Sequence, residues 1–97
     1  MHWEVVEVHP IGDRTLKVSF LDGLTGTVRL DTSFCTGVFR PLLDDQILEQ
    51  ATVQHGVVTW PNDLDLAPDT MYKEIQLSPT RHYEVGRRHA TQELAAA

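Results

Sequence analysis

The chain has little of what stabilises a small secreted domain or holds a protein in a membrane. Cys35 is the only cysteine in 97 residues, so no disulfide can form within the chain. Small secreted domains often depend on disulfides, and we therefore expect a reducing, cytoplasmic environment. The first residues lack the basic and apolar regions of a signal peptide. No stretch reaches the roughly 18 consecutive apolar residues of a membrane-spanning helix, so no membrane association is expected.

Basic side chains are scarce as well. The chain has eight Lys and Arg against 14 Asp and Glu, which gives a formal net charge of −6. The whole excess of acidic residues lies within residues 1–73, because residues 74–97 are neutral. Nucleic-acid binding depends on Lys and Arg that neutralise phosphates, so direct binding of nucleic acid is not expected. An acidic surface instead favours a basic protein partner, although mild acidity also serves simple solubility.

Motifs of catalysis and of cofactor or metal binding are missing too. The sequence contains no glycine-rich phosphate-binding loop and no G-x-S-x-G motif. Its five histidines form no closely spaced pair of the zinc-binding type. Asp63 and Asp65 have the spacing that begins a calcium-binding loop, but the later glycine and glutamate of that loop are absent. With Cys35 expected in the apolar core, we predict a protein that is not an enzyme and binds neither a cofactor nor a metal.

The first half of the chain and a segment before the second helix have the patterns of β-strands. Residues 3–9 are rich in β-branched and aromatic side chains and predict a strand that ends at Pro10. Residues 15–20 and 26–30 alternate apolar and polar side chains around an Asp-Gly turn signal, so they predict an antiparallel hairpin. Two more short strands are expected within residues 52–60, on either side of a His-Gly turn.

Helices are expected in two places. Apolar residues at helical spacing predict a helix from about residue 44 to residue 51. Pro68 suits the first position of a second helix, which is expected to follow a lead-in over residues 64–67 and to run through Ile75. Residues 31–33 predict either the cap of a short helix or a turn.

The pattern of apolar residues ends near residue 77. We therefore predict a single α+β domain over residues 1–77, with a small, mainly antiparallel sheet of about five strands and two short helices. Residues 78–97 contain few large apolar side chains and are expected to form a C-terminal tail, either helical or disordered. Exposed sheet edges pair readily, so a homodimer is a further expectation.

Residues 60–72 form the densest group of aromatic and acidic side chains. One interpretation is structural, with Asn and Asp side chains that form turns and start the second helix. The other is a flat binding surface with an aromatic residue at each end, since aromatic side chains often anchor partners. We take this surface as the candidate site. Its proposed partner-binding residues are Trp60, Pro61, Asn62, Asp63, Asp65, Asp69 and Tyr72.

This segment is also part of a longer pattern. In order, the motifs F-x-D-G, G-T-V, G-V-F, W-P-N and D-L-x-P-D-x-x-Y run from residue 20 to residue 72. Motifs of this kind in this order resemble the bacterial domain-of-unknown-function family 2442, and the similarity covers roughly residues 3–75. Asp63 departs from the family, which usually has glycine at that position.

The resemblance implies a small α+β domain without an established enzymatic activity. Members of that family are often encoded beside another small protein, and such pairs have been proposed as toxin–antitoxin modules. In some relatives a helix-turn-helix domain follows, but residues 76–97 are too short and too poor in apolar residues to form one.

Three hypotheses follow for the function. The first is a non-enzymatic, antitoxin-like module that binds a small, basic, toxin-like protein. The second is a sensory or ligand-binding domain that regulates a DNA-binding unit, with residues 60–72 lining its site. The third and weakest is a hydrolase that uses the carboxylates. We favour the first because of the acidic composition and the gene context of the resembling family.

Overall fold

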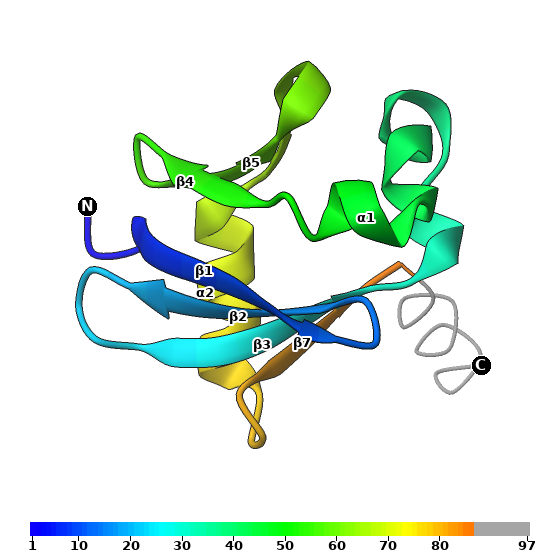
Figure 1. Cartoon of the computed structure of the whole chain (residues 1–97). Helices are drawn as coiled ribbons and strands as arrows, with labels where there is room; N and C mark the ends of the chain where they lie inside the picture. The colour runs from blue at the N-terminus through cyan, green and yellow to red at the C-terminus, as the bar shows by residue number, and fades with distance from the viewer. Residues whose placement is uncertain (87–97) are drawn as a thin grey trace.

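The structure is a computed structural model, and it describes residues 1–86 apart from the side chain of Asn62. It confirms the predicted α+β class, with two α-helices and strands that divide between two sheets (Figure 1). One sheet has four strands in the order β1-β2-β3-β7, and the other has three in the order β4-β5-β6. None of the helices within this described part is long and apolar enough to cross a membrane.

The four-stranded sheet contains the predicted hairpin. Strands β1, β2 and β3 are antiparallel neighbours, and β7 pairs in parallel with β3. On β2 the buried side chains alternate with more exposed ones, as the period of two in the sequence predicts. The bounds are β1 (Val5–Gly12), β2 (Thr15–Phe20), β3 (Thr25–Leu30) and β7 (His82–Val85).

The predicted end of the first strand at Pro10 is wrong. Strand β1 continues through Pro10, which lies opposite Leu16 of β2. A proline is tolerated here because β1 is an edge strand and needs no hydrogen-bond donor on its open side. The chain then turns at Asp13 and Arg14, whose φ angles are +50° and +56°, as in the two-residue turns that match the twist of a hairpin.

The second sheet comprises β4 (Thr52–Gln54), β5 (Val57–Trp60) and β6 (Leu64–Leu66). The hairpin of β4 and β5 is confirmed, including its turn at Gly56. Strand β6 was not predicted, because the sequence suggests only a lead-in to a helix there. It is three residues long, and it pairs antiparallel with β5. Three residues are too few to show the alternation of a strand in the sequence, so only the pairing with β5 identifies β6.

The helix before β4 is reached through 3-10 turns, whereas the second helix follows β6 directly. Helix α1 (Asp45–Leu48) follows a 3-10 helix (Gly37–Leu43) and is shorter than the predicted 44–51, because the chain turns at residues 49–50 before β4 begins. The predicted cap is confirmed: the Asp31 side chain accepts a hydrogen bond from Ser33 N at the start of another 3-10 turn (Thr32–Phe34). Helix α2 (Pro68–Leu77) begins at Pro68 as predicted.

Strand β7 corrects the expected domain boundary at residue 77. Residues 78–97 were predicted to be a tail, but β7 lies within the four-stranded sheet and buries Tyr83 and Val85. The partner positions Thr27 and His82 are 55 residues apart in the chain. A four-residue strand whose partner is so distant has almost no local signal. The rest of the predicted tail, residues 87–97, lies outside the described residues.

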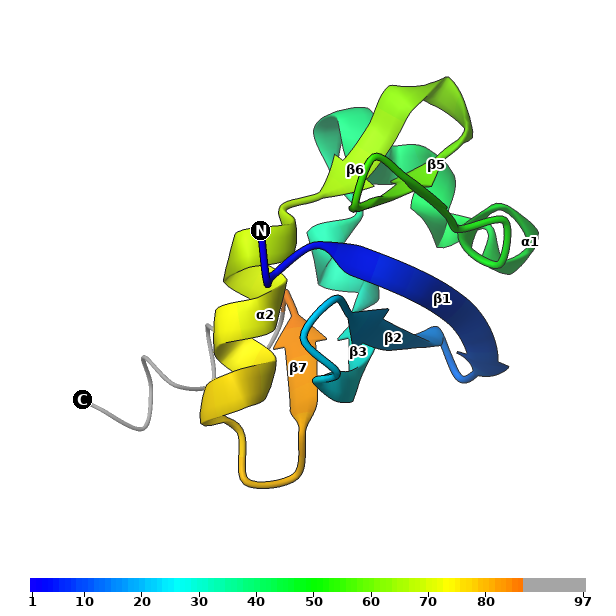
Figure 2. The same cartoon turned by 90° about the vertical axis from the view of Figure 1, so that its left-hand side faces the viewer.

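Helix α2 packs on one face of the four-stranded sheet, and the smaller sheet lies at one end of this layer (Figures 1 and 2). Gly26 on β3 allows the close approach of α2, because a Cβ atom there would lie 2.5 Å from Cγ2 of Ile75. The sheets are linked by a hydrogen bond of 2.9 Å from Val5 N to Gly56 O. Side chains with no exposed surface fill the core: Leu16, Val18, Val28, Leu30, Leu42, Val58 and Ile75.

Candidate functional site

Trp60, at one end of the predicted binding surface, is a core residue. Only 4% of it is exposed. Its Nε1 donates a hydrogen bond of 2.8 Å to the carbonyl oxygen of Leu48, the last residue of α1. The indole therefore ties α1 to β5, and only its edge is available to the surface. The expectation of a flat aromatic platform is wrong for this residue.

Tyr72, at the other end, is also buried and lies on a different part of the molecule. Its hydroxyl donates a hydrogen bond of 2.5 Å to Oδ2 of Asp22, and its ring packs edge-on against Phe20 with centroids 5.2 Å apart. The hydrogen bond raises the pKa of Tyr72 and lowers the pKa of Asp22. The F-x-D-G turn and the tyrosine of the D-L-x-P-D-x-x-Y motif are thus parts of one structural contact.

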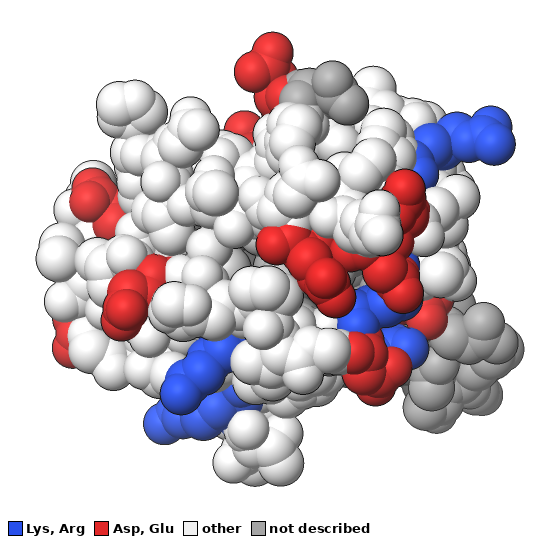
Figure 3. Space-filling view, viewed as in Figure 1, with Lys and Arg blue, Asp and Glu red and all other residues white. Residues whose placement is uncertain are grey.

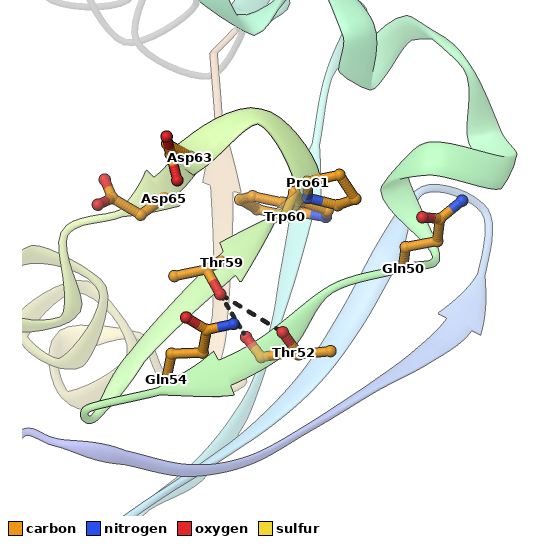
Figure 4. A pocket seen from close by; sticks show the side chains of 8 residues that line it. All are labelled: Gln50, Thr52, Gln54, Thr59, Trp60, Pro61, Asp63 and Asp65. Atoms are coloured by element: carbon orange, nitrogen blue, oxygen red, sulfur yellow. Dashed lines mark hydrogen bonds between the residues drawn. The ribbon is translucent and has the colours of Figure 1, made fainter.

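Three exposed residues of the segment, Pro61, Asp63 and Asp65, line a groove on the outer face of the smaller sheet, which we call groove 1 (Figure 4). The strand register places Thr52, Thr59 and Asp65 in one row across β4, β5 and β6. The hydroxyls of Thr52 and Thr59 are 3.4 Å apart. Groove 1 has a volume of about 440 Å³ and is lined by Gln50, Thr52, Gln54, Thr59, Trp60, Pro61, Asp63 and Asp65.

Groove 1 is acidic. Its two carboxylates, Asp63 and Asp65, lie on the same side of it in Figure 4, and no basic side chain is among its lining residues. Neither carboxylate has an ion pair within the described part of the chain. Both are exposed. A cationic group that entered the groove would therefore meet acceptors that no other residue already uses.

Some carboxylates elsewhere are paired with arginine. Nη1 of Arg14 lies 2.8 Å from Oδ1 of Asp45, and Nη1 of Arg29 lies 2.5 Å from Oε2 of Glu84. Figure 3 shows one face of the molecule, on which acidic and basic side chains lie side by side right of centre. The carboxylates are therefore neutralised unevenly over the molecule, and those of groove 1 are among the carboxylates of residues 1–86 without an ion pair.

Asp63 has a left-handed backbone, with φ of +61°. This conformation is strained for most side chains, but glycine adopts it freely and Asp or Asn tolerates it. The glycine that the resemblance implies at this position would fit the same turn. Aspartate at the same position keeps the turn and adds a carboxylate to groove 1.

Two of the predicted site residues, Asp69 and Tyr72, do not line groove 1. Asp69 lies in the first turn of α2, where its Oδ1 accepts a hydrogen bond of 2.9 Å from Thr70 N, as the capping interpretation predicts. The side chain of Asn62 lies outside what the structure describes. Four groove residues were not predicted, since only the pairing of β4 with β5 places them together: Gln50, Thr52, Gln54 and Thr59.

A second groove of about 340 Å³, groove 2, lies at the start of α2. Its walls are mostly apolar and come from the 3-10 turns, β6, α2 and β7. Phe34 and Phe39 stack there with ring centroids 4.6 Å apart. Asp65 lines both grooves. The residues of groove 2 are Phe34, Phe39, Asp65, Leu66, Ala67, Thr70, Met71, Tyr83 and Val85.

Cys35 lies in the core, as predicted, beside the guanidinium group of Arg14. Nη2 of Arg14 donates to the Cys35 sulfur at 3.3 Å and to the carbonyl oxygen of Leu42 at 2.7 Å. Burial raises the pKa of the Cys35 thiol above its ordinary value, against the opposing effect of Arg14. The thiol is therefore held protonated, which disfavours a nucleophilic role.

A family model described as a protein of unknown function, DUF2442, matches residues 5–76. The match spans the strands β1 to β6 and nearly all of α2, and so includes both carboxylates of groove 1. No curated protein and no solved structure matches the chain.

Proposed function

We propose that this chain, which belongs to the family of proteins of unknown function DUF2442, is a non-enzymatic module that binds a small basic protein in the manner of an antitoxin. The observation that carries the proposal is the pair of unpaired carboxylates in groove 1, Asp63 and Asp65, with no basic residue beside them. We further propose that it acts in the cytoplasm, since its single cysteine needs no oxidising compartment.

The groove offers several acceptors to a cationic side chain. The carboxylates can form charge-assisted hydrogen bonds with Lys or Arg, which are stronger than bonds between neutral groups. The hydroxyls of Thr52 and Thr59 and the amides of Gln50 and Gln54 line the rest of the groove. A net charge of −6 also attracts a basic protein from a distance.

A homodimer through groove 1 is disfavoured by the same charges, because two copies would bring four carboxylates together. Edge pairing through β1 is disfavoured as well. Pro10 cannot donate a hydrogen bond, and the register of β1 against β2 shifts twice along the strand. We therefore expect the chain to bind a different protein through groove 1.

The test is co-expression with the protein encoded by the adjacent small reading frame, with a tag on this chain only. The expected result is co-purification in a fixed ratio and rescue of growth. The double variant Asp63→Asn/Asp65→Asn should weaken the complex at least about tenfold. Both substitutions keep the size of the side chain, and Asn tolerates the left-handed backbone at position 63.

The matched control is Glu7→Gln/Asp13→Asn. It removes the same number of negative charges, two, from exposed residues outside both grooves. Asp13 also has a positive φ, of +50°. The control should keep the affinity of the unchanged chain within about twofold. Absence of any complex at micromolar concentrations, or an equal loss in both double variants, would overturn the proposed role of groove 1.

The alternative is a sensory or ligand-binding domain that regulates a DNA-binding unit. It is supported by the volume of groove 1, about 440 Å³, which falls in the roughly 300–1,000 Å³ range of small-molecule sites. In this case no protein complex should form. Thermal-shift screening with small cationic metabolites should then give a stabilisation that Asp63→Asn/Asp65→Asn removes and Glu7→Gln/Asp13→Asn retains.

A further inference from the structure

We infer that groove 2 is the second half of the same binding surface and takes an apolar side chain of the basic partner. The inference rests on the proposed function of groove 1. It specifies the partner's binding segment: a large apolar residue, seated in groove 2, beside a lysine or arginine that reaches the carboxylates of groove 1.

Continuity of the two grooves is the first step of the argument. Asp65 lies on β6 between Leu64 and Leu66, and it lines both grooves. Leu66 faces groove 2, and β6 leads directly into α2 (Figure 2). A ligand that contacts Asp65 from groove 1 therefore contacts a residue that also lines groove 2.

The chemistry of groove 2 is the second step. Three aromatic rings line it, from Phe34, Phe39 and Tyr83, together with the side chain of Met71. Its volume of about 340 Å³ is sufficient for one large apolar side chain, which buries on the order of 150–250 Å² if it is aromatic. Such an anchor beside a charged pair is the usual arrangement of an interface that a few residues dominate.

Charge complementarity decides which partner fits. Asp65 is the one charged residue in the lining of groove 2, and Asp63 and Asp65 are the charged residues in that of groove 1. An acidic or purely apolar segment would leave these carboxylates buried without a counter-charge, which costs free energy. A segment with adjacent apolar and basic residues satisfies both grooves at once.

The test uses the co-expressed partner and a substitution that fills groove 2 from an exposed position. Thr70→Phe adds a ring at the mouth of the groove on α2, where Thr70 is exposed. We expect this variant to weaken the complex at least about tenfold. The matched control is Gln76→Phe, which adds the same ring at an exposed position of the same helix, outside both grooves. It should leave the affinity unchanged.

A second pair of variants removes part of the wall instead of filling the groove. Phe39→Ala should weaken the complex, whereas Val38→Ala should not, because Val38 is the preceding residue of the same 3-10 helix but is 73% exposed and does not line the groove. The free energy of unfolding of each free variant is measured as well. A loss of affinity counts only for variants that are folded at the assay temperature.

A measurement at high salt distinguishes the contribution of groove 1 to the affinity from that of groove 2. At high salt the contribution of Asp63 and Asp65 is screened, so the residual affinity should depend on groove 2 and should disappear in Thr70→Phe. If Asp63→Asn/Asp65→Asn breaks the complex but Thr70→Phe and Phe39→Ala do not, the inference is wrong and the proposed function stands. If no variant matters because no complex forms, the proposed function itself fails.

Other occupants of groove 2 give different outcomes, and each of them overturns the inference. If Thr70→Phe lowers the melting temperature of the free chain and Gln76→Phe does not, the groove is filled by another part of this chain. If the free chain has a concentration-dependent mass that Thr70→Phe abolishes, the occupant is a second copy. A free chain that is monomeric and equally stable in both variants supports an open groove.

Discussion

The aromatic residues of the motif act as structural contacts between distant elements. Trp60 reaches the carbonyl group of Leu48, and Tyr72 reaches the carboxylate of Asp22. Each of these bonds fixes the end of an element that has few other contacts: the short helix α1 in one case, and the turn after β2 in the other. Substituting Trp60 by alanine is therefore a poor test of binding, because removal of a buried aromatic side chain costs about 3–5 kcal/mol.

Trp60→Phe isolates the hydrogen bond from the packing. We expect a loss of about 1–3 kcal/mol in the free energy of unfolding, because the carbonyl group of Leu48 would remain buried without a donor. Urea unfolding followed by circular dichroism measures this loss. Trp3→Phe is the control, since Trp3 is half-buried and packs against the core without such a bond. Equal losses in the two variants would contradict the assignment.

The Asp22–Tyr72 pair predicts a pH dependence of stability. The Tyr72 hydroxyl lowers the pKa of Asp22 below its ordinary 3.8, with smaller effects from Leu24 N–H and His2. A carboxyl group with a lowered folded pKa contributes stability above its unfolded pKa, and this contribution is lost as the pH falls through the folded pKa. When the pH is lowered from about 7 to about 3, the free energy of unfolding of Tyr72→Phe should therefore fall less than that of the unchanged chain.

The same bond raises the pKa of Tyr72 above its ordinary 10.0. Its contribution is complete below that value and is lost as the pH rises through the folded pKa. Thermal unfolding across both ranges, for the unchanged chain, Tyr72→Phe and Asp22→Asn, measures the effect. Parallel curves for all three proteins would show that the pair does not control the pH dependence.

At the scale of elements, β7 depends on side-chain contacts with β3. The Oγ1 of Thr27 lies 2.7 Å from Nδ1 of His82, and Nε2 of His82 lies 3.0 Å from Oε1 of Glu84. The other oxygen of Glu84 accepts a bond from Nη1 of Arg29. These side chains form a polar network on the outer face of the sheet, in addition to the four backbone positions at which β7 pairs with β3. The network explains how so short a strand keeps its register.

The packing of α2 on β3 predicts the effect of Gly26→Ala. The new Cβ atom would lie 2.5 Å from Cγ2 of Ile75 and 2.7 Å from the carbonyl oxygen of Arg81. Since one of these atoms belongs to the backbone, we expect a loss of about 1–3 kcal/mol in the free energy of unfolding. Chemical unfolding of Gly26→Ala, Ile75→Ala and the double variant measures it. The double variant should lose less than the sum of the single losses, and simple additivity would argue against a clash with Ile75.

At the scale of the whole molecule, charge is the property that reaches a partner first. No basic side chain lines groove 1, so the negative charge of its two carboxylates is not cancelled within the groove. Exposed charges are screened over about 8–10 Å at physiological salt. The attraction should therefore act mainly on the rate of association.

This predicts a salt dependence of binding kinetics. The association rate constant with the co-expressed partner should fall at least about tenfold when NaCl is raised from about 50 mM to about 500 mM. Asp63→Asn/Asp65→Asn should show a flatter dependence, and Glu7→Gln/Asp13→Asn should fall between them because its charges lie farther from the groove. Surface plasmon resonance at several salt concentrations measures the rate. A rate that does not depend on salt would contradict an electrostatic encounter.

Much of the fold could be predicted because its signals are local. The alternation of Leu16, Val18 and Phe20 has the period of a strand, and Pro68 has the backbone angle of a first helical residue. The left-handed turns required residues that tolerate a positive φ, and a His-Gly pair stands at one of them. In each case the physical cause acts over a few neighbouring residues.

The candidate site was predicted in part. Pro61, Asp63 and Asp65 lie in groove 1, but Tyr72 was grouped with them only because it is near in sequence. A linear segment that passes through a 3-10 turn, a strand and a helix presents its side chains to different surfaces. Thr52 and Thr59 were missed for the converse reason, since they meet only across the pairing of β4 with β5.

The sequence by itself determined the α+β class, the two hairpins, the start of α2, the excess of acidic residues and the membership of a family, because these depend on composition, on periodicity and on motif order. Only the tertiary structure decided that β7 completes a sheet with β3, that Trp60 and Tyr72 are buried contacts, and that Asp65 stands between an acidic and an apolar groove. The reason is the distance along the chain. These features join residues 12 to 55 positions apart, and such contacts form only when the whole core is packed.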